Sequence, residues 1–215
     1  MDRRRVLKNM GMSLGYMVAT PTLLSIVQSC KSEPAITWSP EFLAPNEGVV
    51  LSKLVDIILP KTDTPSASEV QVHVFIDKFS KDVMEKEQQD FLKMSMNKFT
   101  NKALADSGKE NVEDLTAEDL EPVLASSLKY TKDQQTEMFE SINSYTEAIA
   151  EGKTAELDDE ITRFAFANNL RGMTIWGYKA SEYVGEEVLA YLPVPGEYVP
   201  CGDAQELTGG KAWSL

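Results

Sequence analysis

The sequence predicts an all-α protein: a single irregular helical domain of about five to seven helices, followed by an irregular tail rich in proline and glycine. Three observations support this fold class. Apolar residues recur at helical spacing through residues 46–192. Helix-start and helix-stop residues flank these segments. Nowhere does the alternation of apolar and polar residues that marks a strand persist. We expect a leader at 1–29, a tether at 30–45, the helical domain at 46–192 and the tail at 193–215.

The leader has the layout of an export signal. A basic start with Arg3 and Arg4 precedes mildly apolar residues from Met10 to Val27. The stretch "DRRRVLK" resembles a twin-arginine signal, which is read by a receptor that exports folded proteins. It departs from that signal at Asp2 and Val6. A retained membrane span is an alternative, although glycine, serine and threonine dilute the apolar run.

Cys30 follows Val27, Gln28 and Ser29, which resemble a lipoprotein cleavage box. Gln28 fits the tighter versions of that box poorly. We expect Cys30 to be the acylated first residue of the mature chain, bound to the membrane on the periplasmic side of a bacterial envelope. The alternative is an ordinary thiol near a normal cleavage point.

The predicted helices are marked by their ends. The first runs from Asn46 to Pro60, the second covers 74–83, and the third runs from Lys86 to Ser107, before Gly108. Two capping pairs then start two more helices, which we expect to form an antiparallel hairpin: Thr116 with Asp119, and Thr131 with Gln134.

A last helical block from Leu157 to Tyr191 is apolar on two sides, which predicts a central, buried helix. Asn168, Asn169 and Arg171 should then include buried polar groups that need partners. Glu182 or Glu186 is the expected partner of Arg171.

Charge and composition exclude several functions. The net charge of −13 disfavours nucleic-acid binding, because such a surface repels phosphates. His73 is the only histidine and there are two cysteines, so the sequence offers no cluster of metal ligands and no haem attachment motif. A glycine-rich dinucleotide fingerprint is also absent from the sequence. We therefore expect no catalytic, cofactor-binding or metal-binding residue in this chain.

Some reactive groups leave alternatives open. Cys201 is interpreted as an inert thiol of the tail, with a disulfide to Cys30 or a bond to a partner as alternatives. We interpret the acidic residues as structural rather than as a catalytic or calcium-binding site, because acids stabilise the first turn of a helix and can form ion pairs. They are Asp158, Asp159, Glu160, Glu182, Glu186 and Glu187.

Four segments together resemble the gluconate 2-dehydrogenase subunit 3 family: "LVDIILPKTDTPSA", "VHVFIDKF", "LRGMTIWGYKASEYVGEEVL" and "YLPVPGEYVPCGD". They span nearly the whole mature chain, although residues 86–150 add little to the resemblance. The resemblance implies a non-catalytic small subunit of a sugar or polyol dehydrogenase. Its implied partners are a large FAD-binding flavoprotein of the glucose-methanol-choline type and, in some complexes, a cytochrome c subunit. The small subunit would stabilise the flavoprotein and escort it through the twin-arginine pathway.

Two motif turns and the tail are the expected partner surface. The turns contribute polar and aromatic residues, and the tail contributes two aromatic residues of the type that dominates binding hot spots. Tyr198 and Trp213 could equally seal the domain's own core. The full set is Asp63, Thr64, Pro65, Tyr178, Ser181, Glu182, Tyr198 and Trp213. The alternative functions are a stand-alone periplasmic binding lipoprotein and, third, an enzyme acting through Cys201 or a carboxylate pair.

Overall fold

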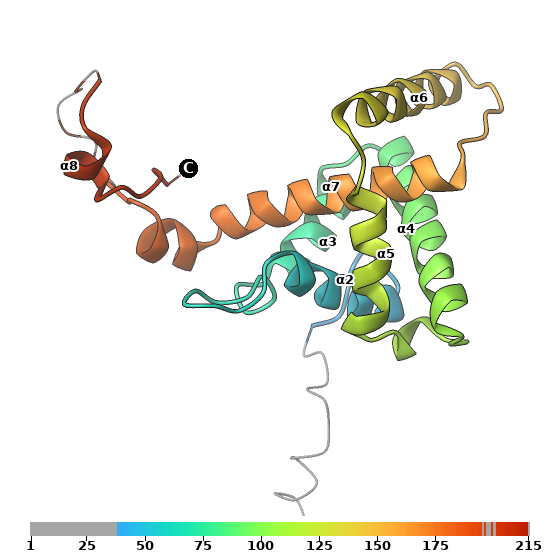
Figure 1. Ribbon diagram of the computed structural model, residues 1–215, viewed down its shortest axis with the longest axis horizontal. Coiled ribbons are helices and arrows are strands. Elements are labelled where there is room, and N and C mark those ends of the chain that lie inside the picture. The colour runs from blue at the N-terminus through green and yellow to red at the C-terminus, as the bar shows by residue number, and fades with distance from the viewer. Residues whose placement is uncertain (1–37, 195, 197–198, 200, 215) are drawn as a thin grey trace, which may run out of the picture. The chain divides into compact units, whose positions relative to one another are not determined.

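The computed structural model describes residues 38–194, 196, 199 and 201–214 (Figure 1). From Ser39 onward the chain forms one compact unit. The described residues contain helices and one isolated β-bridge but no strand, which confirms the all-α prediction. The α-helices are α2 (Pro45–Ile58), α3 (Val72–Asp82), α4 (Lys86–Ser107), α5 (Ala117–Leu128), α6 (Lys132–Ala150), α7 (Asp159–Lys179) and α8 (Ala204–Thr208). A 3-10 turn, η1 (Val112–Asp114), and a π turn, η2 (Val184–Val188), complete them.

Local end signals determine most helix boundaries. Helix α4 has the predicted bounds, and Gly108 ends it with a φ of 68°, a left-handed conformation that glycine adopts readily. Helices α5 and α6 begin after Thr116 and Thr131, as predicted. Helix α2 begins one residue earlier than predicted, because Pro45 occupies its first position and Ala44 caps it.

Helix α7 is the centre of the fold. It packs against α2, α3, α4, α5 and α6. The rings of Phe99 on α4 and Phe166 on α7, both buried, lie with their centroids 5.0 Å apart. The prediction of a central helix in this block is confirmed, and its buried side chains hold the helical layers together through apolar burial.

The polar residues of α7 lie elsewhere than predicted. Asn169 and Arg171 are exposed, and Arg171 donates to Asn168 Oδ1 at 2.8 Å rather than pairing with Glu182 or Glu186. The buried polar side chains of this helix are Thr162 and Thr174. The prediction was wrong because one side of α7 remains in contact with solvent along its second half.

Helices α5 and α6 do not form the predicted hairpin. Each packs against α7 instead, and Figure 1 shows them running at a steep angle to one another. The ring of Phe139 on α6 meets that of Phe164 on α7 at 5.2 Å between centroids. Their order along the chain suggested a hairpin, but each finds its apolar contact on the third helix.

The block predicted to continue to Tyr191 ends as an α-helix at Lys179. Ser181 closes the end, because its N–H and its hydroxyl both donate to the carbonyl oxygen of Tyr178, at 3.2 and 2.7 Å. A serine hydroxyl competes in this way with the regular helix hydrogen bonds. The chain then turns through η2.

A buried carboxylate holds the residues that lead into the domain. Asp77 on α3 is fully buried, and its oxygens accept hydrogen bonds from the N–H groups of Glu41, Phe42 and Leu43, the shortest being 2.7 Å from Glu41. The last residues of the expected tether are therefore fixed to α3. Pro45, the last residue of the expected tether, already belongs to α2, and residues 30–37 lie outside the described residues.

Candidate functional site

The motif "KTDTPSA" forms a polar turn between α2 and α3, which we define as residues 60–69. Ala67 is fully buried, and its N–H donates to the carbonyl oxygen of Leu59 at 3.0 Å. Across the turn, the N–H of Thr62 donates to the carbonyl oxygen of Thr64, also at 3.0 Å. The chain thus folds back on itself twice, which brings its polar side chains onto α2 and α3.

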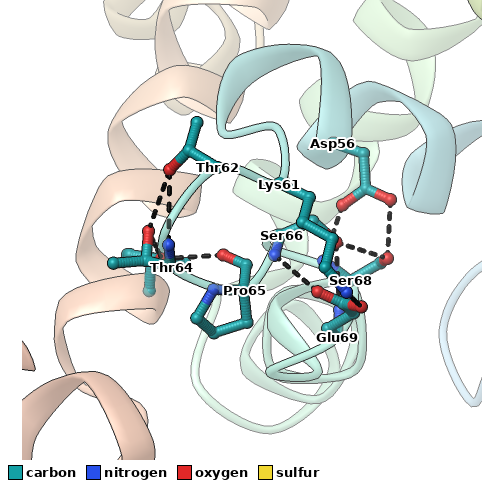
Figure 2. A network of polar contacts seen from close by, with 9 residues as sticks. Asp56, Lys61, Thr62, Thr64, Pro65, Ser66, Ser68 and Glu69 are labelled. Carbon is teal, nitrogen blue, oxygen red and sulfur yellow. Dashed lines mark hydrogen bonds and ion pairs between the residues drawn. The ribbon is translucent and has the colours of Figure 1, made fainter. Parts of the chain in front are cut away.

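Two carboxylates hold the polar turn from within (Figure 2). Asp56 on α2 accepts from the N–H and the hydroxyl of Ser68, at 2.7 and 2.6 Å. Glu69 accepts from the N–H of Ser66 at 2.9 Å and pairs with the Lys61 ammonium at 2.6 Å. The Lys61 ammonium, and after it the N–H of Ser66, hold the pKa of Glu69 below its ordinary value. Hydrogen bonds to carboxylates are the stronger kind, so the turn has a fixed shape.

Helix α7 joins the polar turn through one hydroxyl. The Tyr178 O–H donates to the carbonyl oxygen of Pro65 at 2.8 Å and lies 3.0 Å from Thr64 Oγ1. Tyr178 and Thr64, which lie more than a hundred positions apart in the sequence, are therefore brought together. Tyr178 is half-buried, so this contact is partly shielded from water.

The outer side of the polar turn has a shallow hollow of about 410 Å³. Asp63 lies on it and is exposed, and Tyr183 forms part of its wall. Of the other predicted site residues, Ser181 bonds back to Tyr178 and Glu182 is exposed. The structure thus assembles Thr64, Pro65 and Tyr178 and leaves Asp63 and Glu182 in solvent.

The predicted residues of the tail and leader have different outcomes. Trp213 is 50% exposed and follows Ala212, whose carbonyl oxygen accepts from the N–H of Ala190 at 2.9 Å. It therefore does not seal the core. Tyr198, Arg3, Arg4 and Cys30 lie outside the described residues, and with them the expected signal, lipid and disulfide.

The acidic groups have structural contacts. Asp158 caps α7 by accepting from the N–H of Glu160 at 2.7 Å, Asp159 pairs with Lys98 at 2.8 Å, and Glu160 accepts from the Tyr130 hydroxyl at 3.0 Å. Glu186 and Glu187 are exposed. Within the described ranges, no three histidine, cysteine or acidic residues are placed to hold a metal ion.

His73 is the second residue of α3 and is half-buried. Burial lowers its pKa from the ordinary value, and the Asp56 carboxylate opposes part of this shift. Cys201, in the tail, is exposed.

A second surface was not predicted: an apolar groove of about 780 Å³ where α4 and α6 face each other near the end of α3. We call it the α4–α6 groove. Its walls come from Phe91 and Met94 on α4, Tyr145 and Ile149 on α6, and Phe79 and Val83 beside them.

The sequence carries a signal for two carboxylates that were not predicted to form contacts, Asp56 and Asp77. Asp56 and Asp77 are single acids inside apolar helical runs, "LVDIIL" and "VFIDKF", a pattern that indicates a carboxylate with hydrogen-bond partners, and the structure half-buries Asp56 and fully buries Asp77. The sequence carries no such signal for the α4–α6 groove, because the walls of the groove meet only after α6 folds onto α7.

The described residues define an all-α protein built around α7. Tyr178, near the end of this helix, bonds to the polar turn between α2 and α3, and Asn169, further back, lines the α4–α6 groove. A family model described as gluconate 2-dehydrogenase subunit 3 matches residues 45–196, well over half of the chain, and the chain belongs to this family. No curated protein and no solved structure gives a significant match to it.

Proposed function

We propose that this chain is the non-catalytic small subunit of an exported, FAD-dependent sugar or polyol dehydrogenase of the glucose-methanol-choline type. Its role is to stabilise the large flavoprotein and escort it through the twin-arginine pathway, with FAD held by the flavoprotein. A cytochrome c subunit is a possible third member of the complex.

The family match carries this proposal, because it covers α2 to α7 and so the whole helical core. The twin-arginine-like stretch with Arg3 and Arg4 supports export of a folded, cofactor-loaded complex. The box ending at Cys30 supports a lipid anchor on the periplasmic side. Among the described helices, none is both long and apolar enough to cross a membrane.

Co-expression tests the proposal. The full chain, tagged at its C-terminus, is produced with a large flavoprotein of the glucose-methanol-choline type from the same organism, and membranes are solubilised in mild detergent. We expect both chains and the flavin absorbance to co-purify, and we expect Arg3→Lys with Arg4→Lys to stop export of both. A chain recovered alone would contradict the subunit role, and export of the flavoprotein without this chain would contradict the escort role.

A stand-alone periplasmic binding lipoprotein is the second candidate. The α4–α6 groove favours it, since its volume lies within the range of small-molecule sites. An apolar ligand that co-purifies with the isolated chain and raises its melting temperature would support this function. An isolated chain without bound ligand, which gains stability only with the flavoprotein, would reject it.

A further inference from the structure

An apolar surface continues from the α4–α6 groove onto the outer side of α7. Phe79 lines the groove, and its ring meets the edge of Trp176 with centroids 5.1 Å apart. Trp176 is 43% exposed and Val83, on the groove, 60% exposed. Contiguous exposed apolar surfaces of this kind mark binding sites, and this one extends beyond the groove itself.

Helix α6 is incompletely covered by the rest of the domain. Its 19 residues include none that is buried. Tyr145 ties it to α4, because its ring lies 5.7 Å from that of Phe91 and its hydroxyl 3.8 Å from the Met94 sulfur. Met138, Ile142, Tyr145 and Ile149 recur at helical spacing, and each is half-buried or exposed, so the apolar stripe of α6 is only partly covered.

The charges on the groove select the chemistry of its occupant. Glu87 and Asp90 line it, and its lining contains no lysine or arginine. Lys86, outside the lining, pairs with Asp90 at 2.5 Å, so Glu87 is the main acid that the groove offers to a partner. The whole chain carries a net charge of −13. A basic partner would be attracted, whereas the anionic surface of a membrane would be repelled.

A glycine on α7 points to close approach by another chain. Gly172 lies three residues after Asn169, which lines the groove, and four before Trp176, so all three share one face. No atom lies within 4 Å of the place where a Cβ would be. A glycine in mid-helix weakens the helix relative to alanine, and nothing in the fold requires one here.

We propose that the α4–α6 groove is the docking site for an apolar helix of the large flavoprotein, flanked by lysine or arginine. The inference rests on the proposed function. A groove between two helices seats the side chains of a third at i, i+3 or i+4, and i+7. Aromatic side chains and methionine are enriched at such interfaces, and Phe91, Met94 and Trp176 are of these types.

A matched pair of valine variants tests the site in the full chain co-expressed with the flavoprotein. Val83→Asp places a charge on the groove, and Val194→Asp places the same charge on the tail, where Val194 is 77% exposed. We expect Val83→Asp to weaken binding of the flavoprotein by about tenfold or more, because the cost of burying its carboxylate under an apolar helix exceeds the added attraction to flanking basic residues. Ile149→Asp, on the opposite wall, should do the same, and Val194→Asp should not. Thermal melting checks that each variant is folded.

The outcomes separate the docking site from the proposed function. If Val83→Asp and Ile149→Asp bind as the unchanged chain does, the groove is not the site, although the subunit role stands. If only Val194→Asp loses binding, the tail is the interface and the inference is overturned.

A peptide probe tests the groove without the flavoprotein. An amphipathic helix of leucine and lysine, roughly 18 residues or five turns long, is compared with its leucine and glutamate counterpart. We expect the lysine peptide to bind the unchanged chain and Val194→Asp about tenfold more tightly than Val83→Asp, and the glutamate peptide to bind none of them. This result without flavoprotein recovery would support the groove and reject the proposed function. Equal binding to both peptides would overturn the charge argument, and binding to phosphatidylglycerol vesicles that Val83→Asp abolishes would identify a membrane instead.

Discussion

In the polar turn at residues 60–69 most polar side chains bond to one another or to neighbouring helices, whereas in the α4–α6 groove the apolar side chains face an open space. Asp56 and Ser68 satisfy each other, and Tyr178 closes the turn from α7. Val83 and Ile149, on the groove, have no such cover. The hydrogen bonds of the polar turn therefore stabilise the fold, whereas the apolar side chains of the α4–α6 groove remain exposed and can contact a partner.

The contrast adds a folding role to the motif turns, whose role as a partner surface stays a prediction. The motif turns carry the family resemblance, and they were expected to be the partner surface. Their geometry assigns them first to folding, since Thr64 and Pro65 are held by Tyr178 of the same chain. Residues 86–150, which add little to the resemblance, supply two walls of the groove. Residues of a motif that identifies a family can thus also stabilise the fold.

Loss of Asp56 should have the largest effect on stability. Asp56→Ala removes the acceptor of two charge-assisted hydrogen bonds from Ser68, and we expect the free energy of unfolding to fall by about 2–3 kcal/mol in urea titrations. Asp63→Ala, in the same turn but exposed, is the control and should change it by less than about 0.5 kcal/mol. Equal effects of the two variants would show that the turn does not depend on its internal bonds.

Two glycines of α7 offer a matched comparison. At Gly177 a Cβ would lie 2.6 Å from the Phe75 ring, which itself packs on Phe79 and Trp176, so Gly177→Ala should cost about 1–3 kcal/mol. Gly172→Ala should instead stabilise the isolated chain by roughly 0.5–1 kcal/mol, because alanine favours the helix and nothing is in its way.

The same glycine pair also separates folding from docking. Gly172→Ala should weaken binding of the flavoprotein although it stabilises the chain. If Gly172→Ala binds as tightly as the unchanged chain, the close approach at this helix face is ruled out.

Removal of one hydroxyl should have a smaller effect. Tyr178→Phe leaves the Pro65 carbonyl without its donor, and we expect a loss of about 1 kcal/mol, with binding of the flavoprotein unchanged once the variant is folded. Tyr183→Phe is the control, since Tyr183 is exposed. Lost binding in a fully folded Tyr178→Phe would return the polar turn to the interface.

Acidification should produce the smallest effect. Burial lowers the folded pKa of His73, while in the unfolded chain the pKa is about 6.5. As the pH falls below about 6.5, the unfolded state takes up a proton that the folded state resists, so stability falls with pH until the folded pKa is passed. His73→Gln should flatten this part of the curve of unfolding free energy against pH. An unchanged slope would assign the pH dependence to other groups.

The sequence predicts well where the evidence is local. Thr116, Thr131 and Gly108 mark helix ends through hydrogen bonds and backbone conformations that involve only nearby residues. The central position of α7 followed from apolar residues on two of its sides. These predictions needed no knowledge of how distant segments meet.

Predictions that depend on distant contacts fared less well. The α5–α6 hairpin was wrong because both helices find their apolar partners on α7. The burial of Arg171 was wrong because the sequence did not show which side of α7 stays uncovered. The bond from Tyr178 to Pro65 was not predicted, since no local pattern couples residues so far apart.

The Asp77 carboxylate has a mechanical consequence. Its oxygens accept hydrogen bonds from the backbone N–H groups of Glu41, Phe42 and Leu43, which precede the first residue of α2. A pulling force applied to the chain at residue 38 would therefore be transmitted to α3 before it could unwind α2.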